Sequence, residues 1–94
     1  MNKGEKNKII DRVHSVCRQY ALRCYRVDIW NNYRAWEVRG YDWGIYVIGQ
    51  FPRGEGELQN DYWKEKFIED VEKKFGVPCK VKIVNYFSYK KERK

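Results

Sequence analysis

The spacing of apolar residues changes three times along this chain, and these changes constrain its fold more than any other feature. Over residues 8–25 the apolar side chains recur every three or four positions, which is the period of an amphipathic helix. Residues 25–51 show β-type patterns, residues 60–75 return to the helical period, and Cys79–Ile83 alternates strictly. The sequence therefore predicts the element order α-β-β-β-α-β.

The first predicted helix presents one apolar arc, about 140° wide at about 100° per residue. Its members are Ile9, Ile10, Val13, Val16, Cys17, Tyr20, Ala21 and Cys24. We expect this arc to face the core.

A β-hairpin is predicted next, with strands over 25–30 and 33–39 joined by a turn at Asn31 and Asn32, because Asn tolerates positive φ. The third strand, 45–51, is apolar on both faces, which is typical of the centre of a sheet. Residues 52–57 break the periodicity, and we expect a flexible surface loop there.

The second helix is predicted to begin at a cap formed by Asn60 or Asp61 and to end at Gly76. Its expected core face consists of Trp63, Phe67, Ile68, Val71 and Phe75. In the last strand, which can run on to Phe87, alternation points Cys79, Val81 and Ile83 inward and Lys80 and Lys82 outward.

These elements predict one small α+β domain over residues 1–88, followed by a basic mobile tail over 89–94. Its sheet is expected to be mostly antiparallel, with two helices packed on it and a crossover from the third strand through the second helix to the last strand. The chain has 94 residues, of which 43% are hydrophobic and 17% aromatic, enough for a globular core.

Positive charge is concentrated at the two ends of the chain. Residues 1–26 and 76–94 each carry a net charge of +5, whereas the middle carries −3, for a total of +7. Segregated basic surface is typical of proteins that bind polyanions, because Lys and Arg near phosphates release condensed counterions. We therefore expect a nucleic acid, DNA or RNA, or an acidic protein surface as partner.

The outward face of the first helix carries the sharpest part of this charge pattern, since Asp11 is the only acid between Lys8 and Arg26. Basic residues on the hairpin and the last strand extend the prediction. The predicted polyanion-binding residues are Lys8, Arg12, Arg18, Arg23, Arg26, Arg34, Arg39, Lys80 and Lys82.

Aromatic residues are concentrated between residues 30 and 51. We assign Trp36 and Tyr46 to ordinary packing. Four others lie at predicted turns beside arginines, where they could stack on bases or serve as hot spots for a protein partner: Trp30, Tyr33, Tyr41 and Trp43.

A metal-dependent nuclease is an alternative. The element order resembles that of restriction-endonuclease-like nucleases, whose second strand carries an Asp and whose third carries Glu-x-Lys. Glu37 or Asp42 could replace the Asp, but Ile48-Gly49-Gln50 stands where Glu-x-Lys belongs. Asp28 with Glu37 is a looser match. This departure removes the metal clamp that such chemistry needs, so we expect no enzymatic activity.

The three cysteines predict a reducing, cytoplasmic location. Cys17 and Cys24, both placed on the first helix, would lie about 10 Å apart, beyond disulfide reach. One helical turn separates His14 from Cys17, but without a C-x-x-C pair we expect buried thiols and neither zinc nor any other cofactor.

The preferred function is a small non-enzymatic nucleic-acid-binding protein with weak sequence specificity. The alternative is a protein-interaction module, such as an inhibitor or accessory subunit of a nucleic-acid enzyme, of a size that a virus or mobile element could encode. An atypical metal nuclease comes third. No signal peptide or membrane span is evident in the sequence, so we expect a soluble protein.

Overall fold

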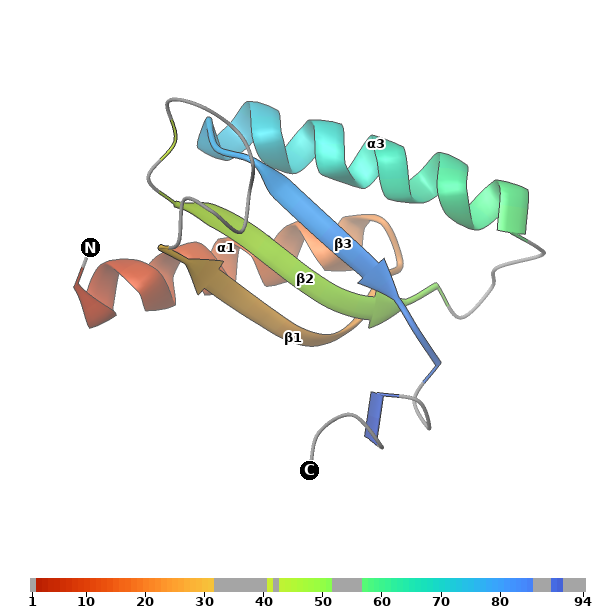
Figure 1. Cartoon of the computed structure of the whole chain (residues 1–94), viewed down its shortest axis with the longest axis horizontal. Coiled ribbons are helices and arrows are strands. Elements are labelled where there is room, and N and C mark those ends of the chain that lie inside the picture. The colour runs from red at the N-terminus through yellow and green to blue at the C-terminus, as the bar shows by residue number, and fades with distance from the viewer. Residues whose placement is uncertain (1, 32–40, 42, 52–56, 86–88, 91–94) are drawn as a thin grey trace.

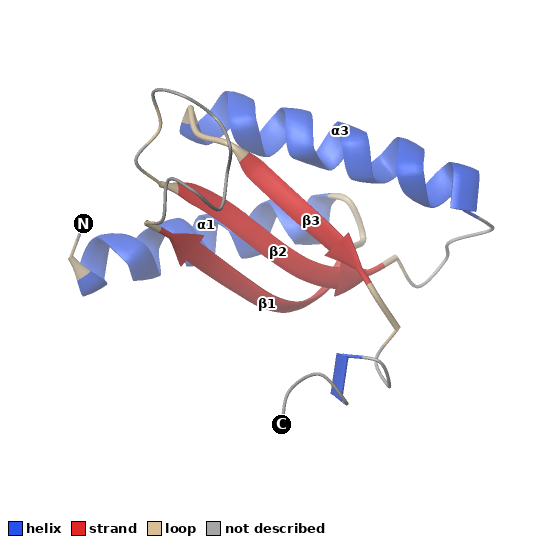
Figure 2. Ribbon diagram, in the orientation of Figure 1, coloured by secondary structure: helices blue, strands red, loops and turns tan. Residues whose placement is uncertain are grey.

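The computed structural model describes residues 2–31, 41, 43–51, 57–85 and 89–90. Within them the chain forms an α+β fold in which two helices pack on a three-stranded sheet (Figures 1 and 2), as predicted. The predicted strand 33–39 lies outside the described residues, so the described order is α-β-β-α-β. The elements are α1 (Lys3–Gln19), β1 (Arg23–Trp30), β2 (Gly44–Gln50), α3 (Glu57–Phe75) and β3 (Cys79–Ile83).

The sheet has the order β1-β2-β3, so the strand that is apolar on both faces is central, as predicted. β1 runs antiparallel to β2, whereas β3 runs parallel to it through the α3 crossover. The described sheet is therefore mixed and not mostly antiparallel.

Helix α1 begins earlier than predicted, because the side chain of Asn2 caps it by accepting a hydrogen bond from the Glu5 backbone N–H at 2.8 Å. It also ends earlier, at Gln19. Ala21 adopts a left-handed φ of 53°, and the backbone N–H groups of Ala21 and Leu22 donate to the carbonyls of Arg18 and Cys17 at 3.2 and 2.9 Å.

This arrangement is a Schellman motif with alanine at the position that glycine usually takes. Periodicity alone extended the helix to residue 25, and that prediction was wrong. Ala21 is exposed and does not face the core, and Cys24 lies in β1.

Helix α3 begins at Glu57, ahead of the predicted cap, and ends before Gly76, whose φ is +69°. Phe67 and Val71 are fully buried, as predicted. Trp63, which the spacing also assigned to the core, is 47% exposed, because it lies on the edge of the apolar arc. Its ring contacts Tyr20 edge-on, with a centroid distance of 6.3 Å.

The core lies between the helices and one face of the sheet. On the sheet side, the core consists of two rows of paired strand residues: Val27, Val47 and Val81 in one, and Ile29, Ile45 and Cys79 in the other. Val13, Val16 and Cys17 of α1 and Phe67 and Val71 of α3 cover them. Among the residues with described side chains, no polar or charged residue is buried.

The alternation predicted for β3 is confirmed: Cys79 and Val81 are buried, Ile83 is half-buried, and Lys80 and Lys82 are exposed. The strand ends at Ile83, although the pattern allowed it to continue. Tyr89, which we placed in a mobile tail, stacks on Tyr25 of β1 at 5.1 Å between ring centroids. Residues 91–94 lie outside the described part of the chain.

Candidate nucleic-acid interface

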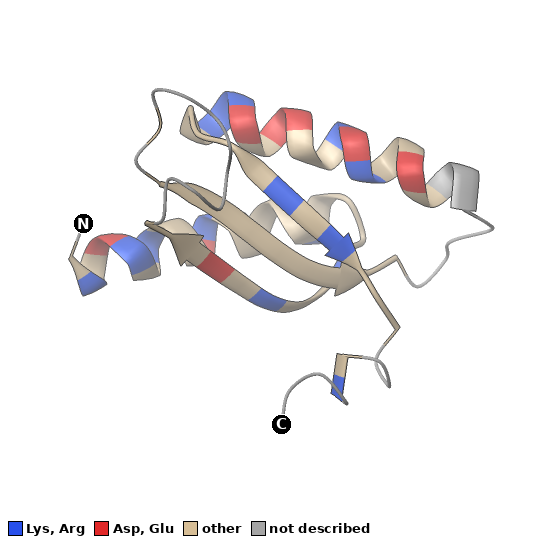
Figure 3. Ribbon diagram, in the orientation of Figure 1, with Lys and Arg blue, Asp and Glu red and all other residues tan. Residues whose placement is uncertain are grey.

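The face of the sheet opposite the helices, which we call the open face, carries the candidate site (Figure 3). Successive side chains of a strand point to opposite faces, so each residue next to a core residue lies on the open face. One row across the strands joins Arg26, Ile48 and Lys82, and the next joins Asp28, Tyr46 and Lys80. Neighbouring strands are about 4.8 Å apart, so each row gathers its side chains within about 10 Å.

Two stacked aromatic pairs lie on or beside these rows. The rings of Trp30 and Tyr46 are 4.7 Å apart and inclined by only 3°, and those of Tyr25 and Tyr89 are inclined by 25°. The two rings of the first pair are half-buried, so part of each contacts solvent. Flat aromatic surfaces on a sheet are the arrangement on which bases of single strands stack.

A β-bulge brings Tyr25 to this face. The register between β1 and β2 shifts between Cys24 and Arg26, which makes Tyr25 an additional residue. Its hydroxyl donates to Gln50 Oε1 at 2.7 Å. A Cβ at Gly49 would lie 2.5 Å from the backbone oxygen of Arg23, so the close approach of the strands at the bulge requires glycine there.

The open face is predominantly positive. Arg26 Nε donates to Asp28 Oδ1 at 2.9 Å, and this bond raises the pKa of Arg26 further. Lys80 and Lys82 are exposed on the adjacent edge strand. Three cations and one carboxylate therefore surround Ile48 and Tyr46 in the two rows, which suits a polyanion backbone running past stacked bases.

The basic stripe predicted for the first helix is divided in the structure. Lys8, Arg12 and Arg18 lie exposed on α1, on the other side of the sheet from the open face, whereas Arg23 and Arg26 belong to β1. The Arg12 guanidinium lies 4.7 Å from the centroid of the Phe75 ring, and Arg18 donates to Ser15 Oγ at 3.0 Å. The described basic residues of α1 and β3 therefore do not form one surface.

The remaining residues of the predicted binding site lie elsewhere. Tyr33, Arg34 and Arg39 lie outside the described residues. Tyr41 is 37% exposed and lines a cavity of about 240 Å³ beside the end of α3, away from the open-face rows. Trp43 is half-buried and packs against the core.

Sequence reasoning missed the aromatic residues at the centre of the open face. Tyr46 was assigned to packing because a small core needs some of the aromatic residues, yet in the described part of the chain α1 and α3 cover one face of the sheet and Tyr46 lies on the other. Tyr46 pairs across the strands with Asp28 and Lys80, and this charged neighbourhood indicates an open-face position. The pairing can be recognised only once the order of the strands is known.

A second exposed aromatic cluster lies on α3. Tyr62 and Trp63 are 54% and 47% exposed, and their rings meet edge-on at 5.1 Å. Tyr20 adds its ring from α1, and its hydroxyl donates to Asp70 Oδ2 at 3.1 Å. Burial and this hydrogen bond raise the pKa of Tyr20. The helical spacing hid this cluster by assigning Trp63 to the core.

Cys17 and Cys24 lie on different elements, whereas we expected both on the first helix. Cys24 belongs to β1 and not to the first helix, so helical rise does not give its separation from Cys17. Interaction with the Cys24 thiol, together with burial, raises the pKa of Cys17. Interaction with the Cys17 thiol lowers the pKa of Cys24, although burial of Cys24 acts in the opposite direction. Burial raises the pKa of Cys79 to about 12. All three are free thiols, and Cys17 and Cys79 are buried.

The described residues hold no group of three or more His, Cys, Asp or Glu side chains that could bind a metal ion. Asp28, the one described carboxylate of the nuclease alternative, forms an ion pair with Arg26, while Glu37 and Asp42 lie outside the described residues. No helix in the described ranges is both long and apolar enough to cross a bilayer. No family model, curated protein or solved structure matches the chain.

Proposed function

We propose that this protein binds single-stranded nucleic acid, without catalysis, on the open face of its sheet. The main support for this proposal is the stacked pair of Trp30 and Tyr46, with exposed Lys80 in the same row as Tyr46 and exposed Lys82 in the adjacent row. Stacking on an aromatic side chain contributes about 1–3 kcal/mol per base and tolerates any sequence, because every base has a π-face. Binding would therefore be weakly sequence-specific.

The open face suits a single strand better than a duplex. Its aromatic side chains are flat and partly accessible, and a duplex keeps its bases stacked inside. The exposed basic residues on α1 lie on the other side of the sheet, so they do not contact the bound strand. They add only long-range electrostatic attraction, which salt screens beyond about 10 Å at 0.1 M.

Salt dependence tests the placement of the contacts. We would titrate a fluorescein-labelled single-stranded oligonucleotide by anisotropy at several salt concentrations, with wild type and with Lys80→Gln/Lys82→Gln. Two lost phosphate contacts should reduce the slope of log K against log salt by roughly 1.4, at about 0.7 per contact for a single strand.

The matched control is Lys3→Gln/Lys8→Gln, which removes the same charge from exposed positions of α1. We expect its slope to stay close to that of wild type. Equal slope losses in both double variants would show that only net charge matters and would contradict an open-face site.

The exposed cluster of Tyr20, Tyr62 and Trp63 favours a second candidate, a protein-interaction module such as an inhibitor or accessory subunit of a nucleic-acid enzyme. Tyr and Trp are enriched among interface hot spots. This candidate predicts that Trp63→Ala abolishes capture of one defined protein from nuclease-treated lysate, whereas Tyr46→Ala leaves it unchanged. The reverse pattern would assign the partner to the open face.

A further inference from the structure

The outer edge of β3 is the end of the described sheet, because no described strand pairs with it. Its ladder with β2 shows which backbone groups point outward. Ile45 N–H donates to the Pro78 carbonyl, and Val84 N–H donates to the Gly49 carbonyl, both at 2.9 Å. Because backbone groups alternate in direction along a strand, those of Pro78 and Val84 face β2, and those of Cys79, Val81 and Ile83 face away from the sheet.

One of these outward groups has a partner within the chain. The Cys79 backbone N–H donates to Glu72 Oε2 of α3 at 3.1 Å, which confirms the direction derived from the ladder. α3 therefore closes the edge at the start of β3. The outward groups of Val81 and Ile83 lie farther along the strand, where a groove opens.

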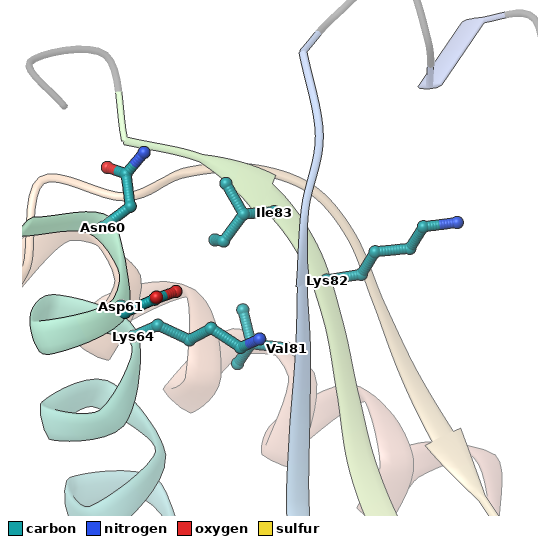
Figure 4. Close-up of a pocket in the computed structure, with 6 residues that line it drawn as sticks. All are labelled: Asn60, Asp61, Lys64, Val81, Lys82 and Ile83. Carbon is teal, nitrogen blue, oxygen red and sulfur yellow. The ribbon is translucent and has the colours of Figure 1, made fainter. Parts of the chain in front are cut away.

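This groove lies between the first half of α3 and the last half of β3 and has a volume of about 500 Å³ (Figure 4). Asp61 and Lys64 extend from the helix toward the strand, and Val81 and Ile83 extend from the strand toward the helix. On the rim, Asn60 Oδ1 is buried without a hydrogen-bond partner among the described residues. The groove thus combines backbone donors and acceptors with apolar side chains and an acceptor that an incoming N–H could satisfy.

Charge on the edge strand selects the kind of chain that can pair there. Lys80 and Lys82 are exposed on the open face, and in an antiparallel pairing with a second copy of β3, lysines would lie opposite lysines. Like charges directly opposite destabilise a pair, and lysines on an edge strand prevent such self-pairing. A strand with carboxylates at the same positions would be attracted to these lysines, whereas a second copy of β3 would be repelled by them.

We propose that β3 accepts an extended segment of a partner protein in which carboxylate and apolar side chains alternate, and that this segment adds to the sheet as a further strand. Its apolar side chains enter the groove beside Val81 and Ile83, and its carboxylates lie next to Lys80 and Lys82. Backbone hydrogen bonds provide affinity and the alternate side chains provide specificity. This site shares Lys80 and Lys82 with the proposed nucleic-acid site, but it does not involve Trp30 or Tyr46 and does not depend on nucleic-acid binding.

The test uses three synthetic peptides, each acetylated and amidated, added to the full ¹⁵N-labelled chain. The parent peptide is Glu-Val-Glu-Val-Glu-Val, and the other two carry N-methyl groups on all valine nitrogens or on all glutamate nitrogens. Only the nitrogens that face β3 donate to it, and those belong to valine in an antiparallel pairing and to glutamate in a parallel one. We expect one methylated peptide to lose at least tenfold in affinity and the other to bind like the parent.

Amide exchange in the protein gives the second readout. The parent peptide should slow exchange of the Val81 and Ile83 N–H groups at least tenfold, and Lys80→Gln/Lys82→Gln should weaken it several-fold, whereas Lys3→Gln/Lys8→Gln should not. The proposal is overturned if both methylated peptides bind like the parent or if no peptide binds at millimolar concentration. Protection of these two amides in a self-associated protein without peptide would assign the edge to a second copy and would also overturn it.

Discussion

The two faces of the sheet differ in chemistry although the same three strands build both. The covered face presents Val27, Val47 and Val81 to the helices, and the residues next to them on the open face are charged, aromatic or aliphatic. A chain of 94 residues must bury most of its large apolar side chains in order to fold, and the covered face provides that burial. Stacked rings among cations are not needed for that purpose, and we infer that this difference separates the residues that hold the fold from those that bind.

Two neighbouring residues of β2 point to opposite faces, and the largest difference in stability is expected between them. Ile45 is fully buried, so Ile45→Ala should lower the free energy of unfolding by about 2–5 kcal/mol through lost burial and a cavity. Tyr46→Ala on the open face should cost less, because the ring is only half-buried; loss of the stacked pair with Trp30 contributes about 0.5–1.5 kcal/mol beyond the lost burial. Urea denaturation followed by circular dichroism measures both. Equal losses at the two positions would show that both faces serve the fold.

High pH should lower the stability of the fold through Cys79, a buried thiol on the covered face. The pKa of Cys79 is raised from 9.0 to about 12 by burial, so the unfolded chain loses this proton at lower pH than the folded chain. Stability from this group is complete below pH 9 and is lost as the pH rises to about 12, up to about 4 kcal/mol.

Thermal melts of wild type and Cys79→Ala from pH 8 to pH 11 measure this loss. The wild type should destabilise more steeply, because the variant lacks the group that ionises. Parallel pH profiles for the two proteins would contradict the burial of a protonated thiol at this position.

The turn between α1 and β1 offers a stabilising change. Ala21 has a φ of 53°, a conformation that costs an L-residue about 1–2 kcal/mol relative to glycine. Ala21→Gly should raise the free energy of unfolding by up to about 1 kcal/mol, because the greater freedom of glycine in the unfolded chain offsets part of the gain. Ser15→Gly, within the helix, should destabilise by up to about 1 kcal/mol. Destabilisation by both would show that the left-handed turn is not at Ala21.

The smallest effect on stability is expected at Asp28. Its ion pair with Arg26 is partly exposed, so Asp28→Asn should change stability by less than about 1 kcal/mol. The same change removes the negative charge from the two open-face rows and should tighten oligonucleotide binding several-fold at low salt. Asp11→Asn on α1 is the matched control and should leave binding nearly unchanged. Weaker binding by Asp28→Asn would place the strand elsewhere.

Much of the covered face could be predicted from the sequence, because burial imposes periods on a chain. The alternation in β3, the central place of β2 and the buried Phe67 and Val71 all follow from such periods. The end of α1 did not follow, because the left-handed turn at Ala21 lacks the glycine that usually marks it.

The open face could be predicted only in part. Lys80, Lys82 and Arg26 were found from charge and alternation, but Tyr46 and Tyr25 were not. Their places depend on strand order and on a bulge, which bring together residues that no local pattern connects. Charge alone also joined α1 and β1 into one stripe, because the helix was taken to continue past its end.

Nuclear magnetic resonance of the indole N–H groups can show directly whether a single strand binds on the open face. Trp30 lies on the open face, and Trp63, 47% exposed on α3, is an internal reference. As a twelve-residue oligothymidylate or oligouridylate is added to ¹⁵N-labelled protein, the Trp30 signal should shift with saturation while the Trp63 signal stays in place. A saturable shift of Trp63 with Trp30 unmoved would contradict binding on the open face.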